Sequence, residues 1–208
     1  MIQLKLIPAV AILALSATGC SLLSAEPDPT RFAILASADE LPGAPKPPES
    51  AANSLRIGLG PIQLPDYLRR AAIVTRSQGT RLVPSPTESW AEPFDSSLGR
   101  VLAIDLQREL GIAQPTIHPW YEPDKPELQV EIAFSRCELD EDGKVVVACQ
   151  WILRRLDASH ATLGRGLRLE RPVAHRDGAS VARAISELLV ELCKSIGVSV
   201  RELSPKQE

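Results

Sequence analysis

Apolar residues recur at helical spacing in two segments of the chain. Over residues 94–110, five of them fall on one face of a predicted helix: Leu98, Val101, Leu102, Leu106 and Leu110. Either Asp95 or Ser96 is expected to cap the free amides at its start, and Gly111 to end it. This segment therefore predicts an amphipathic helix of almost five turns.

The second segment, residues 178–196, has the clearest helical pattern. Its apolar face comprises Val181, Ala184, Ile185, Leu188, Leu189, Leu192 and Ile196. Asp177 precedes it as a candidate N-cap, and Gly197 is predicted to lie just past its end. Cys193 lies beside this apolar face and is expected to be a buried thiol.

Short apolar runs between turn residues predict strands in the rest of the chain. The expected strands are residues 31–36, 55–62, 71–76, 80–83, 127–139, 144–156 and 163–171. Residues 140–143, Asp-Glu-Asp-Gly, form a hairpin turn signal, and the proline-rich residues 37–54 read as a loop. Strands with two long helices predict one α/β domain with a mixed sheet.

The N-terminus has the pattern of an export signal. Lys5 precedes an apolar run over residues 6–15, and small residues follow at 16–19. The run has about half the roughly 20 residues that a spanning helix needs. Gly19-Cys20 resembles the lipobox of bacterial lipoproteins, which implies cleavage before Cys20 and acylation of its thiol and amine with chains such as palmitate. In the alternative, this is an ordinary signal peptide and Cys20 is incidental.

This interpretation divides the chain into four parts. They are a signal peptide over residues 1–19, a lipidated tether over 20–30, the α/β domain over 31–203, and a tail over 204–208. By resemblance to enterobacterial lipoproteins, Ser21 in place of Asp implies export to the outer membrane, with the domain facing the periplasm.

Composition and charge exclude several classes of partner. The 208 residues carry 23 Lys and Arg against 26 Asp and Glu, and only 4% are aromatic. A chain with no basic surplus and few aromatic residues has neither the charge to grip a phosphate backbone nor a platform on which bases stack. We therefore expect no nucleic-acid partner.

The sequence lacks the motifs that carry catalysis. The three histidines, His118, His160 and His175, have no metal-ligand spacing, and no nucleophile elbow, phosphate-binding loop or dinucleotide fingerprint occurs. The carboxylates at 140–142 belong to a turn and lack calcium-loop spacing. We expect neither an enzyme nor a metal or other cofactor.

Cys137 and Cys149 lie on the two strands of the predicted hairpin. A loop over residues 142–144 would place them directly opposite, where a disulfide forms readily in an oxidising compartment. A loop over 140–143 would turn them to opposite faces of the sheet. The register of the hairpin decides between a bridge and free thiols.

Four motifs in order resemble one family. They are LGPIQLPDYL at 59–68, IVTR at 73–76, SWAEPFDSSLGRVLAIDL at 89–106, and the hairpin from ELQVEI at 127 to QWIL at 153. Behind a lipobox, this order resembles the PqiC family, the paraquat-inducible protein C or ABC-type transport auxiliary lipoproteins. The resemblance extends from about Arg31 to Gly197.

The resemblance implies a fold, a location and a partner. It implies an anticodon-binding-like α/β fold without any RNA function, in an outer-membrane lipoprotein that docks an MCE-domain protein of an envelope lipid-transport system and supports membrane integrity. It also implies self-association into a homo-oligomeric ring. A stand-alone periplasmic binding or structural lipoprotein is the alternative, with a hydrolase a distant third.

The segment Pro65-Asp66-Tyr67-Leu68 has two interpretations. Proline followed by a polar residue and two apolar ones is typical of a strand-ending turn whose tyrosine packs on the core. A rigid turn carrying an exposed aromatic is also suited to anchor a protein partner, since little entropy is lost on binding. The sequence alone leaves both open.

Overall fold

The computed structural model describes residues 28–43, 54–121, 125–157 and 159–203. Ten elements and a short 3-10 helix follow one another along this part of the chain. They are β1 (Arg31–Ala33), β2 (Ile57–Gln63), η2 (Asp66–Arg69), β3 (Ala72–Ser77), β4 (Arg81–Trp90), α2 (Phe94–Leu110), β5 (Thr116–Ile117), β6 (Leu128–Asp140), β7 (Lys144–Arg155), β8 (Thr162–Pro172) and α3 (Gly178–Leu203). The predicted mixed α/β domain with two long helices is confirmed.

All eight described strands belong to one mixed sheet, built around β6. On one side β6 pairs antiparallel with β7, which pairs antiparallel with β8. On its other side β6 pairs with two strands in succession, β2 over residues 128–133 and β3 over residues 139–140, both parallel. The sheet therefore forks along β6, with β2–β5 in one branch and β3–β4–β1 in the other.

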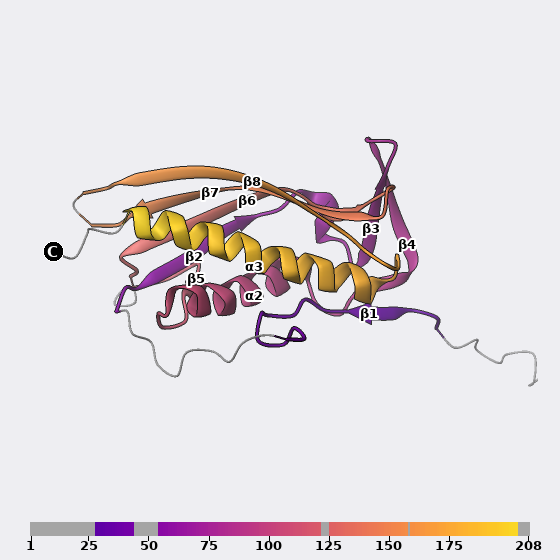
Figure 1. Ribbon diagram of the computed structural model, residues 1–208, viewed down its shortest axis with the longest axis horizontal. Helices are drawn as coiled ribbons and strands as arrows, with labels where there is room; N and C mark the ends of the chain where they lie inside the picture. Colours follow the sequence, from indigo (N-terminus) through magenta and orange to yellow (C-terminus); the bar gives the residue numbers. More distant parts are fainter. Residues whose placement is uncertain (1–27, 44–53, 122–124, 158, 204–208) are drawn as a thin grey trace, which may run out of the picture.

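Helices α2 and α3 lie side by side on one face of this sheet (Figure 1). The periodic residues predicted for each helix form the core with the inward side chains of the strands; Leu98, Leu102, Ile185 and Leu189 are fully buried. The opposite face of β7 shows exposed Gln150, Ile152 and Arg154. The sheet is thus amphipathic in the way expected of a two-layer α/β domain.

One predicted N-cap and one predicted helix end are wrong. The N-cap of α2 is Pro93 and no side chain caps the helix, because Asp95 lies inside the first turn and pairs with Arg69 of η2 at 3.0 Å. Helix α3 does not stop at Gly197 but continues to Leu203. At Gly197 the two helices pass closely, since a Cβ there would lie 2.8 Å from the Cγ of Glu109 on α2.

The other two caps are confirmed. Gly111 ends α2 in the left-handed conformation, with φ of 60°, and its amide donates to the Gln107 carbonyl. At the start of α3, the Ser180 amide donates to the Asp177 carboxylate at 2.8 Å. Among the described residues, no helix has the length and apolar character needed to cross a bilayer.

Candidate functional site

The predicted docking segment lies at the fork of the sheet. Pro65 precedes η2. This short helix lies between the part of β6 that pairs with β2, which ends at Ala133, and the part that pairs with β3, which begins at Leu139. Leu68 is buried, Tyr67 is half-buried, and the Asp66 side chain is fully exposed. The structure therefore brings the four residues to one surface turn, with Asp66 outermost.

Tyr67 is held in place by a buried carboxylate. Its hydroxyl donates to Glu138 Oε2 at 2.7 Å, and the guanidinium of Arg76 lies 5.5 Å from the centre of its ring. Burial and the neighbouring Glu138 raise the pKa of Tyr67 to about 12, so the phenol stays protonated. The ring serves the packing of the fork, as the strand-ending-turn interpretation expects.

Glu138 is the centre of this cluster. Its side chain is completely buried and accepts hydrogen bonds from Arg76 Nε and Arg136 Nε, each at 2.7 Å, and from the Cys137 amide at 2.9 Å. Burial on its own would raise the pKa of Glu138, but the bonds from Arg76, Tyr67 and Arg136 outweigh it and hold the pKa below its usual range. A buried carboxylate with four donors is a structural anchor, since no free oxygen faces a substrate.

Sequence reasoning missed Glu138 as a partner of Tyr67. The two residues are 71 positions apart, and the only local signal is a charged residue within an apolar strand. An irregularity in the β6–β7 register between Phe134 and Arg136 accompanies the cluster. A bulge of this kind re-aims the side chains that follow it.

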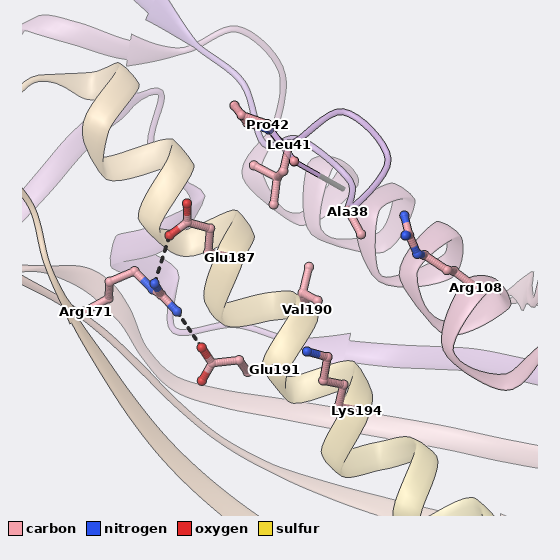
Figure 2. A pocket seen from close by; sticks show the side chains of 10 residues that line it. Ala38, Leu41, Pro42, Arg108, Arg171, Glu187, Val190, Glu191 and Lys194 are labelled. Carbon is pink, nitrogen blue, oxygen red and sulfur yellow. Dashed lines mark hydrogen bonds and ion pairs between the residues drawn. The ribbon is translucent and has the colours of Figure 1, made fainter. Parts of the chain in front are cut away.

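A hollow of about 330 Å³ opens beside α3 (Figure 2). Its apolar wall includes Leu41 and Pro42 from the loop after β1, together with Val190 of α3. From β8, Arg171 reaches across to Glu187 and Glu191, pairing with Glu187 at 3.1 Å. Because Arg108 pairs with Asp39 on the far wall, most of the charge is balanced within the protein.

A second hollow, of about 340 Å³, lies on the other side of the Arg171–Glu187 pair. It is lined by the first turns of α3 and by residues 172–174. In both hollows the charged side chains project from a helix or strand. Among the described lining residues, no nucleophile, base or metal ligands converge on one point. Within the described residues, no group of three His, Cys, Asp or Glu side chains is placed to hold a metal ion.

Asp105 is a buried carboxylate on α2 that the sequence did not single out. Its Oδ1 accepts the Ala38 amide at 2.7 Å, which fastens the loop after β1 to the helix, while its Oδ2 has no hydrogen-bond partner. Burial is the main reason that its pKa rises to about 6, with Asp39 and Glu40 adding to the effect against the Ala38 amide and Arg108.

We expect this buried charge to make stability depend on pH. Because the pKa of Asp105 is higher in the folded protein than in the unfolded chain, its contribution is fully present below about pH 4 and is lost as pH rises through about 6. Asp105→Asn keeps the acceptor for Ala38 without the charge, so it should raise the unfolding free energy at pH 8 by about 1–3 kcal/mol. Urea denaturation at pH 5 and pH 8 checks this, and an equal gain at both values would contradict it.

The two hairpin cysteines face the same core but are not opposite each other. Cys137 pairs with Val147 and Cys149 with Phe134, so the two cysteines are diagonal neighbours. Diagonal Cα atoms are usually about 7–8 Å apart, beyond the roughly 4.4–6.8 Å of most disulfides. Both are buried free thiols, as is Cys193, and burial raises the pKa of Cys149 to about 12. The hairpin turn comprises residues 141–143, and so it is neither the loop over 142–144 nor the loop over 140–143 that the sequence suggested.

The predicted lipidation site, Cys20, and the predicted signal peptide lie outside the described residues. The three histidines lie on different parts of the surface: His118 follows β5 and contacts Trp120 edge to face, whereas His160 and His175 lie in the loops before β8 and α3. No described cluster unites them.

Comparisons with known proteins give a consistent picture. Residues 40–197 match the family model described as ABC-type transport auxiliary lipoprotein component. No curated protein matches the chain. Among solved structures, a DUF330-family protein from Xanthomonas campestris superposes with a TM-score of 0.62 at 14% identity, covering 84% of this chain and 99% of the other.

Two further structures are similar. An uncharacterized protein has a TM-score of 0.61 at 16% identity, covering 73% of this chain and 95% of its own. The PelC dodecamer of Paraburkholderia phytofirmans has a TM-score of 0.43 at 15% identity, covering 74% and 95%. The two structures with TM-scores above 0.6 show the shared fold, and the family model spans most of the sequence; the chain therefore belongs to the family of ABC-type transport auxiliary lipoprotein components.

Proposed function

We propose that this protein is a non-enzymatic subunit of an envelope lipid-transport system. It is anchored in the outer membrane through Cys20, faces the periplasm, and docks an MCE-domain protein. The observation that carries the proposal is membership of the transport auxiliary lipoprotein family over residues 40–197. The lipobox at Gly19-Cys20 supports it.

The docking surface that we propose is the turn at Pro65–Leu68. Asp66 is its most exposed group, and Arg69 beside it is half exposed and pairs with both Asp66 and Asp95. Because Tyr67 and Arg76 brace this turn against Glu138, the turn is rigid and would lose little entropy on binding. Tyr67 thus supports the docking surface, and Asp66 and its neighbours would contact the partner protein.

Capture of the partner tests this proposal. The wild-type protein, solubilised from envelopes of a strain that encodes an MCE-domain protein, should retain that protein in a pull-down. Asp66→Ala should weaken the capture without changing the melting temperature, since Asp66 is exposed. Failure of the wild-type protein to retain any MCE-domain partner would favour the alternative of a stand-alone lipoprotein. Light scattering measures the mass of the purified protein in solution. This mass tests whether the protein also forms the homo-oligomeric ring that the family resemblance implies.

Tyr67 is expected to act through stability. Tyr67→Phe removes the hydroxyl that donates to Glu138 but keeps the ring, so we expect a loss of about 1 kcal/mol in unfolding free energy. Tyr67→Ala also removes the half-buried ring and should cost about 3 kcal/mol. Thermal denaturation measures both. Full stability of Tyr67→Ala together with lost partner capture would instead make Tyr67 a contact residue.

The anchor has its own test. Cys20→Ser should release the protein from membranes or leave an uncleaved precursor, because the acceptor thiol for the diacylglyceryl group is gone. Fractionation of envelopes and metabolic labelling with palmitate measure this directly. Label that persists on the Cys20→Ser protein would exclude Cys20 as the lipidation site.

A further inference from the structure

Two large apolar side chains lie exposed at the edge of the sheet, immediately after the tether. Phe32 on β1 is 68% exposed and Ile34, just past the strand, is 53% exposed. They alternate with Ala33 and Leu35, which are buried in the core. Because side chains alternate across an extended chain, Phe32 and Ile34 share one outward face, which we call the β1 face.

The core interactions of this segment keep the β1 face pointing outward. Ala33 is paired with Trp90 of β4, and its carbonyl accepts the Ala91 amide at 2.8 Å. The Leu35 carbonyl accepts from Arg100 of α2 at 3.0 Å. Turning Phe32 inward would expose Ala33 and Leu35 and break these bonds. The apolar pair therefore stays at the surface unless something covers it.

The length of the tether indicates what covers it. Phe32 follows the acylated Cys20 by 32 − 20 = 12 residues. Twelve residues span at most about 43 Å when fully extended, so the bilayer that holds the anchor is always within reach of the β1 face. Of the large apolar side chains that are exposed in the described part of the chain, these two are closest in sequence to the anchor; the next, Val83, is about 50 residues further along.

The chemistry of the segment also suits a lipid surface. Two neighbouring apolar side chains can enter the boundary between head groups and acyl chains, and a tethered domain pays little entropy to place them there. Arg31, whose side chain is 74% exposed and 3.3 Å from Glu88, directly precedes them in the chain, and a basic side chain beside such a segment is attracted to anionic lipid. A weak apolar contact of this size binds a membrane only when a second signal is present, and the acyl anchor is that signal.

We propose that the β1 face docks the domain on the membrane that carries its lipid anchor, with Phe32 and Ile34 inserted at the lipid boundary. The domain then has a fixed orientation on the bilayer, and does not hang freely from its tether. This inference rests on the anchoring through Cys20 proposed above. It does not depend on the identity of the protein partner.

A fluorescent probe in the β1 face tests the contact. Acylated full-length protein carrying Ile34→Cys, labelled with an environment-sensitive dye, is reconstituted into vesicles of phosphatidylethanolamine and phosphatidylglycerol. Labelling is selective because Cys137, Cys149 and Cys193 are buried. The matched control is Val83→Cys, since Val83 is also a half-exposed apolar side chain but lies on β4 near its hairpin turn.

We expect blue-shifted emission and several-fold stronger quenching by spin-labelled lipid at position 34 than at position 83. Adding Phe32→Ser should reduce the quenching at position 34 several-fold while the acyl anchor keeps the protein on the vesicles. Equal, water-like emission at both positions would overturn the proposal. So would shielding at position 34 that depends on protein concentration in detergent, because a second copy would then cover the face.

The same samples separate this inference from the proposed function. Mass spectrometry of the N-terminal peptide reports whether Cys20 is acylated, and a pull-down of the MCE-domain protein reports partner capture. Acylated protein that captures the partner but shows no quenching at position 34 overturns the β1-face contact alone. A chain without acylation removes the anchor on which both proposals depend.

Discussion

Glu138→Gln is expected to cost about 3 kcal/mol of unfolding free energy. The substitution preserves the shape of the side chain but removes the negative charge, leaving Arg76 and Arg136, each about four-fifths buried, without a counter-ion. It also turns an amide N–H₂ toward groups that are themselves donors. Removing one partner from a buried, hydrogen-bonded charge cluster is costly because the remaining charges stay desolvated.

The matched control is Glu131→Gln on the same strand. Glu131 pairs with Arg154 at 3.3 Å, and the Arg154 side chain is about half exposed and that of Glu131 about one quarter exposed, so water still reaches the pair and the loss should be below about 1 kcal/mol. Urea denaturation followed by circular dichroism measures both variants. Equal losses would show that the fork of the sheet does not depend on the Glu138 charge.

The pH dependence gives a second measure of the same cluster. The pKa of Glu138 is lower in the folded protein than in the unfolded chain, so its contribution is present above about pH 4.5 and is lost as pH falls through the folded value. Acid should therefore destabilise the wild-type protein more steeply than Glu138→Gln. Asp105 has the opposite sign, which makes the two buried carboxylates distinguishable in one titration of stability.

Periodicity predicted the two helices and the long hairpin because those elements bury one face continuously. The apolar stripe of α3 and the alternation along β6 and β7 recur in the buried residues of the structure. The end of α3 was mispredicted for a tertiary reason: glycine at 197 is a local stop signal, but here it makes room for Glu109 of a neighbouring helix. No local pattern carries that information.

The site was harder to predict because its partners are distant in sequence. The sequence proposes the segment Pro65–Leu68 as a candidate, but whether Tyr67 faces solvent depends on Glu138, which reaches it only through the pairing of β3 with β6. The hairpin cysteines likewise depend on the register. The run at 31–36 predicts a strand, but its pattern does not tell which side chains face the core; the structure buries Ala33 and Leu35 and exposes Phe32 and Ile34.

Gly58→Ala is expected to cost about 2 kcal/mol of unfolding free energy. Gly58 is the second residue of β2 and is paired with Thr116 of β5 and Gln129 of β6. A Cβ at this position would lie 2.6 Å from Pro126 Cγ and 2.8 Å from the Trp120 ring. Inserting a methyl group into a packed contact forces neighbouring side chains to move, and overpacking of this kind typically costs about 1–3 kcal/mol.

Gly166→Ala on β8 is the matched control, because it makes the same substitution in another strand without the close contact. A Cβ at Gly166 would meet its nearest atom, Gln150 Cγ, at 3.6 Å, an ordinary van der Waals distance. Its effect should stay within about 0.5 kcal/mol. Thermal denaturation compares the two variants, and tryptophan emission reports whether Trp120 has moved toward water. Equal stability of the two variants, with unchanged tryptophan emission, would contradict this prediction. It would show that Trp120 and Pro126 accommodate the methyl group without a loss of unfolding free energy.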